Sequence, residues 1–235
     1  NTFHDKKLLT KYALDKSNVV AVGEMVKLNL INEFELNENK VDVIYNGVRQ
    51  YEGEIKPLEI LSNLKNEGYF LVGNIGRISE QKGMEYFISA ADEIIKENKN
   101  FRFIIVGEGD KREEIEQLIK KLKLEEYVIL LGYRSDVSNI IAQLDLVVLS
   151  SLWEGLPLTP IETFSMKKTI VATAVDGTVE IINDGENGIL IPPKDSKAIA
   201  DSVLKIYNDS NIKNAMEANA YKTYLNEFSY KKFIE

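Results

Sequence analysis

The sequence predicts an α/β protein: a Rossmann-like, doubly wound parallel sheet, preceded by part of a second Rossmann-like domain. Two patterns indicate this class. Eight short segments are rich in β-branched residues, and most are continuously apolar, which is typical of strands buried on both faces. Amphipathic segments lie between them, and strand–helix alternation repeated this often favours parallel strands joined by right-handed crossovers.

The expected strands follow one another along the chain, at residues 18–22, 41–45, 69–76, 101–107, 127–132, 144–150, 169–175 and 188–193. Helices are expected between several of them. Residues 82–98 place apolar side chains at helical spacing, with charges on the other face. Residues 110–124 begin with acids and end with lysines, as the helix dipole favours. Residues 195–209 open with Asp195, a suitable N-cap residue.

Composition shifts divide the chain into parts. Residues 67–210 hold six of the expected strands and form the main domain. The polar segment 49–66, which contains a proline and follows an Asn-Gly turn, is expected to be a linker. Residues 1–48 hold only about two strands and two helices, too few to bury a core alone. The chain also starts without Met, at "NTFHDKK", so we expect 1–48 to be the end of a domain that begins earlier.

Composition also excludes several kinds of site. The chain has 29 basic and 37 acidic residues, and its formal charge of -8 argues against a general nucleic-acid binder. The absence of cysteine excludes thiolate chemistry, and a single histidine excludes a multi-histidine metal site. Neither a signal peptide nor an apolar run long enough to span a bilayer is present, so a cytoplasmic location is expected.

Loops that follow the strands of an open parallel sheet are where ligands bind. The loop "GNIGRISEQKG" brings Arg77, Lys82 and the flexible Gly76 to one strand end. A guanidinium fork, an ammonium and close backbone approach suit a diphosphate, although two solvated surface cations are the plainer interpretation. On the next two strands, Gly107 favours a tight turn. "GYRSDV" offers Tyr133 and Arg134 beside a flat base or, equally, in a solvated loop.

Two glutamates eight residues apart flank the segment "EGLPLTPIE". Glu162 fits a capping box, with Thr159 as N-cap and Pro160 at the first helical position. Glu154 precedes that helix in a loop, where the amides of Gly155, Leu156 and Leu158 would be free for an anionic or hydroxylated ligand. Residue spacing leaves open whether the carboxylates form an acid/base pair or accept hydrogen bonds from paired hydroxyls such as those of a ribose.

Together these motifs resemble glycosyltransferase family 4, whose members are retaining enzymes with the GT-B fold. "GRISEQKG", "VGEGD", "LLGYRSDV", "LVVLSSLWEGLPLTPIE" and "GENGILIPP" occur in the family's order and spacing over nearly all of residues 41–193. The resemblance implies that 67–210 is the nucleotide-sugar-binding domain and 211–235 the helical region that crosses back. It also implies that 1–48 is the remnant of the acceptor-side domain, most of which is missing.

The resemblance also implies roles for individual residues. Arg77 and Lys82 would hold the donor's diphosphate and stabilise the leaving group, with Glu154 on the donor sugar and Glu162 on the ribose. Other residues would line the nucleotide-sugar site: Gly76, Gly107, Tyr133, Arg134 and the backbone of Gly155, Leu156, Pro157 and Leu158. His4 is similar to a family histidine near the donor sugar, or is a terminal histidine without a role.

The activity implied is metal-independent transfer of a hexose, with retention of configuration, from a nucleotide diphosphate sugar to a glycan, lipid or protein acceptor. A uridine nucleotide is favoured over a guanosine one, no cofactor is expected, and association with the cytoplasmic membrane face is compatible with the family. The alternatives are a non-catalytic nucleotide-sugar-binding module and another GT-B enzyme, such as a sugar-nucleotide epimerase. Departures from the family pattern affect turns, as at "DG" (176–177), and include Gly23 where a serine is common.

Overall fold

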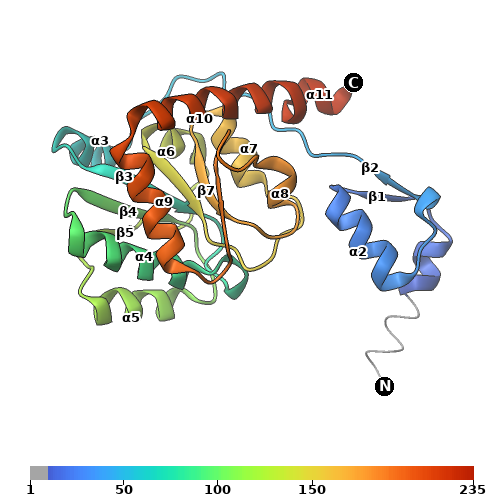
Figure 1. The fold of residues 1–235 in the computed structure, drawn as a ribbon, viewed down its shortest axis with the longest axis horizontal. Coiled ribbons are helices and arrows are strands. Elements are labelled where there is room, and N and C mark those ends of the chain that lie inside the picture. The colour runs from blue at the N-terminus through green and yellow to red at the C-terminus, as the bar shows by residue number, and fades with distance from the viewer. Residues whose placement is uncertain (1–9) are drawn as a thin grey trace.

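A computed structural model describes residues 10–235 of the chain. His4, which the family resemblance places near the donor sugar, lies outside the described residues. A small N-terminal unit and a larger sheet domain are visible in Figure 1, with the C-terminal helices lying along one edge of the larger domain. Among residues 10–235, no helix is both long and apolar enough to cross a membrane.

The main sheet has six parallel strands in the order β5-β4-β3-β6-β7-β8. Their bounds are β3 Phe70–Ile75, β4 Phe101–Val106, β5 Val128–Leu130, β6 Leu146–Leu149, β7 Ile170–Thr173 and β8 Ile189–Ile191. Counted from the first strand of this sheet, the order is 3-2-1-4-5-6, the doubly wound arrangement of dinucleotide-binding folds. Its strand order reverses between β3 and β6, so a ligand crevice is expected beyond the ends of those two strands.

The small unit contains a helical stretch at 10–15 and two parallel strands, β1 Val19–Ala21 and β2 Val41–Val43. Helix α2 (Glu24–Phe34) and a short 3₁₀ helix, η1 (Glu38–Lys40), connect the strands. With these two strands, all eight predicted strands are confirmed.

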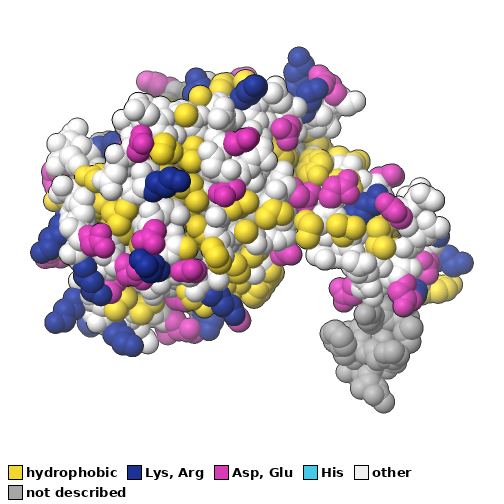
Figure 2. All heavy atoms as spheres, in the orientation of Figure 1, with side chains coloured by type: hydrophobic (Ala, Val, Ile, Leu, Met, Phe, Trp, Pro, Cys, Tyr) yellow, Lys and Arg dark blue, Asp and Glu magenta, His cyan; other side chains and the backbone are white. Residues whose placement is uncertain are grey.

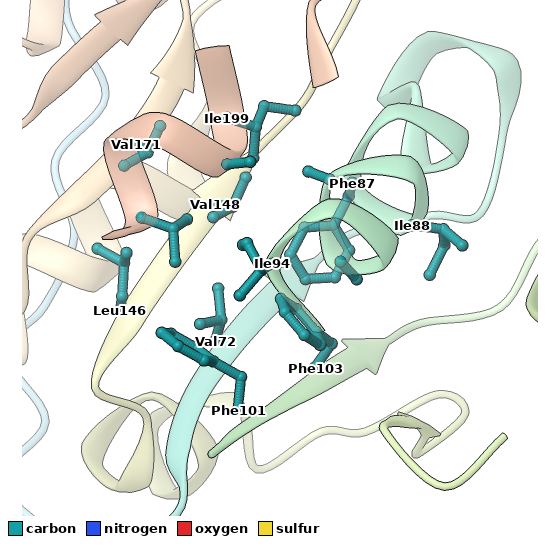
Figure 3. Packing of buried hydrophobic residues seen from close by; sticks show 14 of the residues in the cluster. Val72, Phe87, Ile88, Ile94, Phe101, Phe103, Leu146, Val148, Val171 and Ile199 are labelled. Atoms are coloured by element: carbon teal, nitrogen blue, oxygen red, sulfur yellow. The ribbon is translucent and has the colours of Figure 1, made fainter. Parts of the chain in front are cut away.

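Helices cover both faces of the main sheet, because alternate residues of each strand point to opposite faces. They are α3 Glu59–Asn66, α4 Met84–Glu97, α5 Arg112–Leu122, α6 Val137–Gln143, α7 Leu158–Ser165, α8 Thr178–Ile181, α9 Ser196–Asn208 and α10 Ser210–Thr223. On one face, strand residues pack against Phe87 and Ile94 of α4 and Ile199 of α9 (Figure 3). A second cluster on the other face includes Leu61, Ile140 and Ile161, from α3, α6 and α7. The predicted N-cap at Asp195 is confirmed, since its carboxylate accepts from the Ala198 amide at 2.9 Å.

The segment predicted as a linker, 49–66, contains helix α3 in its second half. Leu61 of this helix is fully buried in the main core. The backbone before the helix is held as well, because the Lys56 and Leu58 amides donate to the side chains of Asn139 and Gln143. Residues from about 56 onward therefore pack as part of the main domain.

The C-terminal segment holds the chain where it leaves the small unit. After α10 come a π-helical turn, η3 (Tyr224–Phe228), and helix α11 (Tyr230–Ile234). The backbone amide of Val48 donates to the carbonyl of Phe228 at 2.9 Å. The Tyr224 hydroxyl and the Tyr230 amide donate to the Val48 carbonyl at 3.0 and 2.9 Å. The region 211–235 thus holds the chain at Val48, while its helices lie along one edge of the larger domain in Figure 1.

Helix α8 of the main domain contacts the small unit directly. The Glu180 carboxylate accepts hydrogen bonds from the Glu24 amide at 2.7 Å and the Met25 amide at 2.8 Å, at the start of α2. It also accepts from the Tyr45 hydroxyl at 2.7 Å. Burial, followed by the contact with Glu180, raises the pKa of Tyr45 to about 12.

Candidate functional site

The predicted site residues gather at the carboxyl end of the main sheet, where its strand order reverses. Arg77 and Lys82 follow β3, and Glu154 follows β6. Buried polar side chains tie these two strand ends together. The Asn74 amide donates to the Ser150 hydroxyl at 3.0 Å, and that hydroxyl donates to the Lys82 carbonyl at 2.9 Å. The sequence therefore brings the two loops to the crevice that the topology predicts.

Lys82 and Glu154 form an ion pair inside this crevice. Lys82 Nζ lies 2.5 Å from Glu154 Oε1, and the side chains are only 15% and 6% exposed. The Ser151 hydroxyl donates to the same carboxylate oxygen at 2.6 Å, and Gln81 approaches the other oxygen at 3.4 Å. Glu154 is therefore fixed by three side chains. The sequence analysis did not single out Gln81 or Ser151 as its partners.

The backbone of the Glu154 loop is held from a third strand end. The Glu154 amide donates to Asp176 Oδ2 at 2.8 Å, and the Gly177 amide donates to the Gly155 carbonyl at 3.0 Å. A side chain at Gly177 would meet that carbonyl, because an added Cβ would lie 2.0 Å from the Gly155 oxygen. Asp176 and Gly177 are the "DG" pair at which the sequence departs from the family pattern.

Free backbone amides lie beside the ion pair, as expected. In the described part of the chain, the amides of Gly155, Leu156 and Leu158 donate no hydrogen bond. Leu156 and Pro157 are buried, so they can offer a ligand mainly their backbone. Free amides at the start of α7 are suited to phosphate or hydroxyl oxygens.

The capping box expected around Glu162 is wrong. Helix α7 begins one residue before Thr159, with Pro157 as its N-cap and no side-chain cap. The Thr159 hydroxyl instead reaches the Ile75 carbonyl at 3.4 Å, which anchors α7 to the end of β3. The capping box failed because the helix already begins at Leu158, which puts Thr159 inside the first turn instead of at the N-cap.

Glu162 consequently lies in the second turn of α7 and does not cap the helix. Its carboxylate has no hydrogen-bond or ion-pair partner within residues 10–235. Burial raises the pKa of Glu162 above its usual value. A half-buried, unpartnered carboxylate is costly in a helix, so a structural role does not account for this residue.

Residues after β3, β4 and β5 enclose a pocket of about 360 Å³ next to the ion pair. Its lining includes five predicted site residues: Gly76, Arg77, Gly107, Tyr133 and Arg134. Gly76 adjoins the ion pair, because an added Cβ would lie 3.3 Å from Cε of Lys82. Gly107 adopts a φ of +145°, and an added Cβ would lie 1.9 Å from the Gly76 carbonyl, so this turn requires glycine.

Two arginines border the pocket, and they differ in how tightly each is paired with an acid. The Arg77 side chain is 73% exposed, and its guanidinium lies 3.6 Å from Asp110, so it is available to a ligand. Arg134 forms two parallel hydrogen bonds with Asp136, at 2.8 and 2.7 Å. This pairing raises the pKa of Arg134 and lowers that of Asp136. Tyr133 is 77% exposed beside it, so the planar ring and the planar guanidinium form one wall of the pocket.

Twelve of the thirteen predicted site residues thus lie in the loops after β3, β4, β5 and β6 or in α7, and only His4 falls outside the described residues. No group of three or more acidic or histidine side chains within residues 10–235 is arranged to hold a metal ion.

The family of the chain follows from its similarity to known proteins. Residues 56–223 match the family described as "Glycosyl transferases group 1", and this match spans more than half of the chain. The chain belongs to the group 1 glycosyl transferases. Its sheet and helices have the GT-B architecture of the solved glycosyltransferases that it resembles.

Characterised relatives support the assignment. The chain is 34% identical over 148 residues to alpha-D-kanosaminyltransferase from Streptomyces kanamyceticus, covering 62% of this chain and 38% of the relative. It is 29% identical to an Escherichia coli UDP-Gal:alpha-D-GlcNAc-diphosphoundecaprenol alpha-1,3-galactosyltransferase, covering 87% of this chain and 54% of that enzyme. The crystal structure of Anabaena HepE in complex with UDP matches with a TM-score of 0.81 and 25% identity, covering 92% of this chain and 61% of that chain. This group 1 chain therefore spans about 40% to 60% of its relatives' lengths.

Proposed function

We propose that this group 1 chain forms the donor-binding part of a retaining, metal-independent glycosyltransferase of family 4 that uses a UDP-sugar. The observation that carries the proposal is the Lys82–Glu154 pair, 2.5 Å apart at the switch point between β3 and β6, beside free amides and a pocket. The names of two similar proteins, which specify UDP-Gal and UDP, support the choice of uridine.

The chemistry of sugar transfer uses each part of this site. Breaking the bond between sugar and diphosphate builds negative charge on the leaving oxygen, and preorganised cations lower that barrier. Arg77 and Lys82 supply the cations. An ammonium has three donors, so Lys82 can retain Glu154 while it binds a phosphate oxygen. Glu154 faces the donor sugar, and Glu162 accepts from the ribose hydroxyls. The acceptor is a glycan, lipid or protein, and we assign no protein nucleophile.

Calorimetric titration with UDP, GDP and ADP, each with magnesium and with a chelator, tests the proposal. UDP is expected to bind most tightly and without dependence on magnesium. Arg77→Ala is expected to weaken UDP binding about tenfold, the loss of one charge-assisted hydrogen bond. Lys197→Ala on α9 is the matched control, because Lys197 is as exposed as Arg77, at 75% against 73%, and also faces one acid. Equal UDP affinity in Arg77→Ala and the parent chain would reject the assignment.

A further inference from the structure

Asp176 stands in an unusual backbone conformation directly against the Glu154 loop. Its φ is +38°, in the left-handed region that favours glycine. The residue follows β7, on the opposite side of β6 from β3. A residue that persists in such a conformation is held there by its surroundings, and such residues concentrate at functional sites.

The side chain of Asp176 does something that glycine cannot. Its Oδ2 accepts the Glu154 amide at 2.8 Å, the sole side-chain contact to that amide among residues 10–235. The neighbouring Gly177 amide donates to the Gly155 carbonyl at 3.0 Å. Asp176 and Gly177 thus each form a hydrogen bond with the backbone of the loop, at Glu154 and Gly155. The backbone on either side of the Glu154 side chain is thereby fixed relative to β7.

Two independent sets of contacts therefore converge on Glu154. Lys82, Ser151 and Gln81 hold its carboxylate, and Asp176 holds its backbone amide. A carboxylate that selects a hydroxylated ligand must be kept in one geometry, because small displacements lose most of the gain from such contacts. The Glu154 amide is therefore occupied by Asp176, whereas the amides of Gly155 and Leu156 stay available to ligand oxygens.

We propose that Asp176 is a positioning residue for the donor sugar: it fixes the Glu154 loop and so sets how much affinity the sugar adds to that of the nucleotide. This inference rests on the proposed donor site. Asp176 affects sugar binding by holding the Glu154 backbone, and the negative charge of Asp176 itself is not needed for this. Binding of UDP alone engages Arg77, Lys82, Glu162 and the pocket, none of which bonds to Asp176, so it depends on Asp176 much less than binding of the sugar does.

Two variants test this in the full 235-residue chain. Asp176→Gly removes the acceptor and suits the positive φ, so the fold is retained. Asp176→Asn removes the charge but keeps an acceptor oxygen on a residue that also tolerates the left-handed conformation. The probes are UDP, UDP-glucose, UDP-galactose and UDP-N-acetylglucosamine, titrated calorimetrically against each variant. Amide hydrogen exchange of the 150–158 segment, without ligand, measures the anchoring directly.

In Asp176→Gly, we expect UDP affinity within twofold of the parent chain, a loss of at least fivefold for the best UDP-sugar, and faster exchange at Glu154. Asp176→Asn is expected to retain the parent affinities within twofold. Sugar affinity unchanged in Asp176→Gly, unchanged exchange, or equal losses in both variants would each overturn the proposal. So would a parent chain that binds UDP and all three UDP-sugars equally. Failure of the parent chain to bind UDP would instead refute the donor site itself.

Discussion

At the scale of single residues, Glu162 combines a structural cost with a proposed binding role. Its raised pKa means that the folded chain binds a proton at this carboxylate more tightly than the unfolded chain does. The ionised form therefore opposes folding, and the contribution of this residue to stability rises as pH falls through the raised pKa. Ribose hydroxyls need the ionised acceptor, so UDP affinity changes in the opposite sense and falls over the same pH range.

Glu162→Gln should separate these two effects at pH 7. We expect a higher unfolding temperature, because a neutral amide removes the buried charge, and about tenfold weaker UDP binding, because a charge-assisted hydrogen bond is lost. The difference in UDP affinity between the variant and the parent chain should also shrink as pH falls from neutrality towards the ordinary glutamate value of 4.5. Thermal unfolding and calorimetry at several pH values measure both. Lower stability with unchanged affinity would indicate a structural role.

The Lys82–Glu154 pair leads to a second prediction at this scale. Lys82→Met leaves the Glu154 carboxylate, 6% exposed, without its counter-ion, so we expect a loss of about 3 kcal/mol of unfolding free energy. Adding Glu154→Gln removes the uncompensated charge and should recover most of that loss. Denaturant unfolding of both single variants and the double variant gives the coupling energy. Additive losses would show that the two side chains do not interact.

At the scale of elements, helix α2 depends on an acid from the other part of the molecule. Gly23 is its N-cap and supplies no side-chain acceptor, while Glu180 accepts from the Glu24 and Met25 amides. An added Cβ at Gly23 would lie 2.9 Å from the Glu180 carboxylate, so glycine leaves room for this acid. The family pattern often has a serine at this position, which would cap the helix locally.

Glu180→Ala should therefore uncap α2 at a cost of about 1 kcal/mol. Adding Gly23→Ser should restore the cap, because the space that Glu180 occupied is then open. Gly23→Ser alone should not stabilise the helix, since the serine crowds Glu180. The rate of hydrogen exchange at the Glu24 and Met25 amides measures the loss of the cap directly. If exchange at these amides is the same in Glu180→Ala and the parent chain, Glu180 does not cap α2.

The elements also show what sequence reasoning could and could not reach. Strands were predictable because runs such as 103–106 and 146–149 are continuously apolar, which is a local property. Arg77, Lys82 and Glu154 could be placed near one another because parallel strands end at the same edge. The contacts of Asp176 and Glu180 could not be predicted. Each is a hydrogen bond between segments at least 22 residues apart, and it forms only when the folded chain brings those segments together. The capping box at Glu162 failed because the helix begins one residue earlier than the local pattern predicts.

At the scale of the whole molecule, the small unit contributes little core of its own. Three of its hydrophobic residues, Ala21, Leu36 and Val41, are buried, whereas Val20, Leu28 and Ile44 are about half exposed. Apolar spheres of this unit and of the main domain remain visible on the surface in Figure 2. The two buried clusters of the main domain are far larger. The small unit should therefore open at a lower free energy than the main sheet.

Removal of residues 1–48 should consequently leave the main domain folded and able to bind UDP. Every predicted site residue within the described part of the chain lies between Gly76 and Glu162, and the family match begins at residue 56.

We expect the 49–235 chain to unfold cooperatively, with UDP affinity within about threefold of the full chain, which is under 1 kcal/mol. The truncation frees Glu180 and removes the Val48 backbone contacts of Tyr224, Phe228 and Tyr230, but it touches no proposed UDP ligand. A control that removes 1–66, and with it α3 and the fully buried Leu61, should be destabilised and prone to aggregate. Calorimetric titration and thermal unfolding of both truncated chains decide the matter. If 49–235 fails to fold or loses UDP binding, the small unit is an integral part of the donor-binding domain, and the division at residue 48 is wrong.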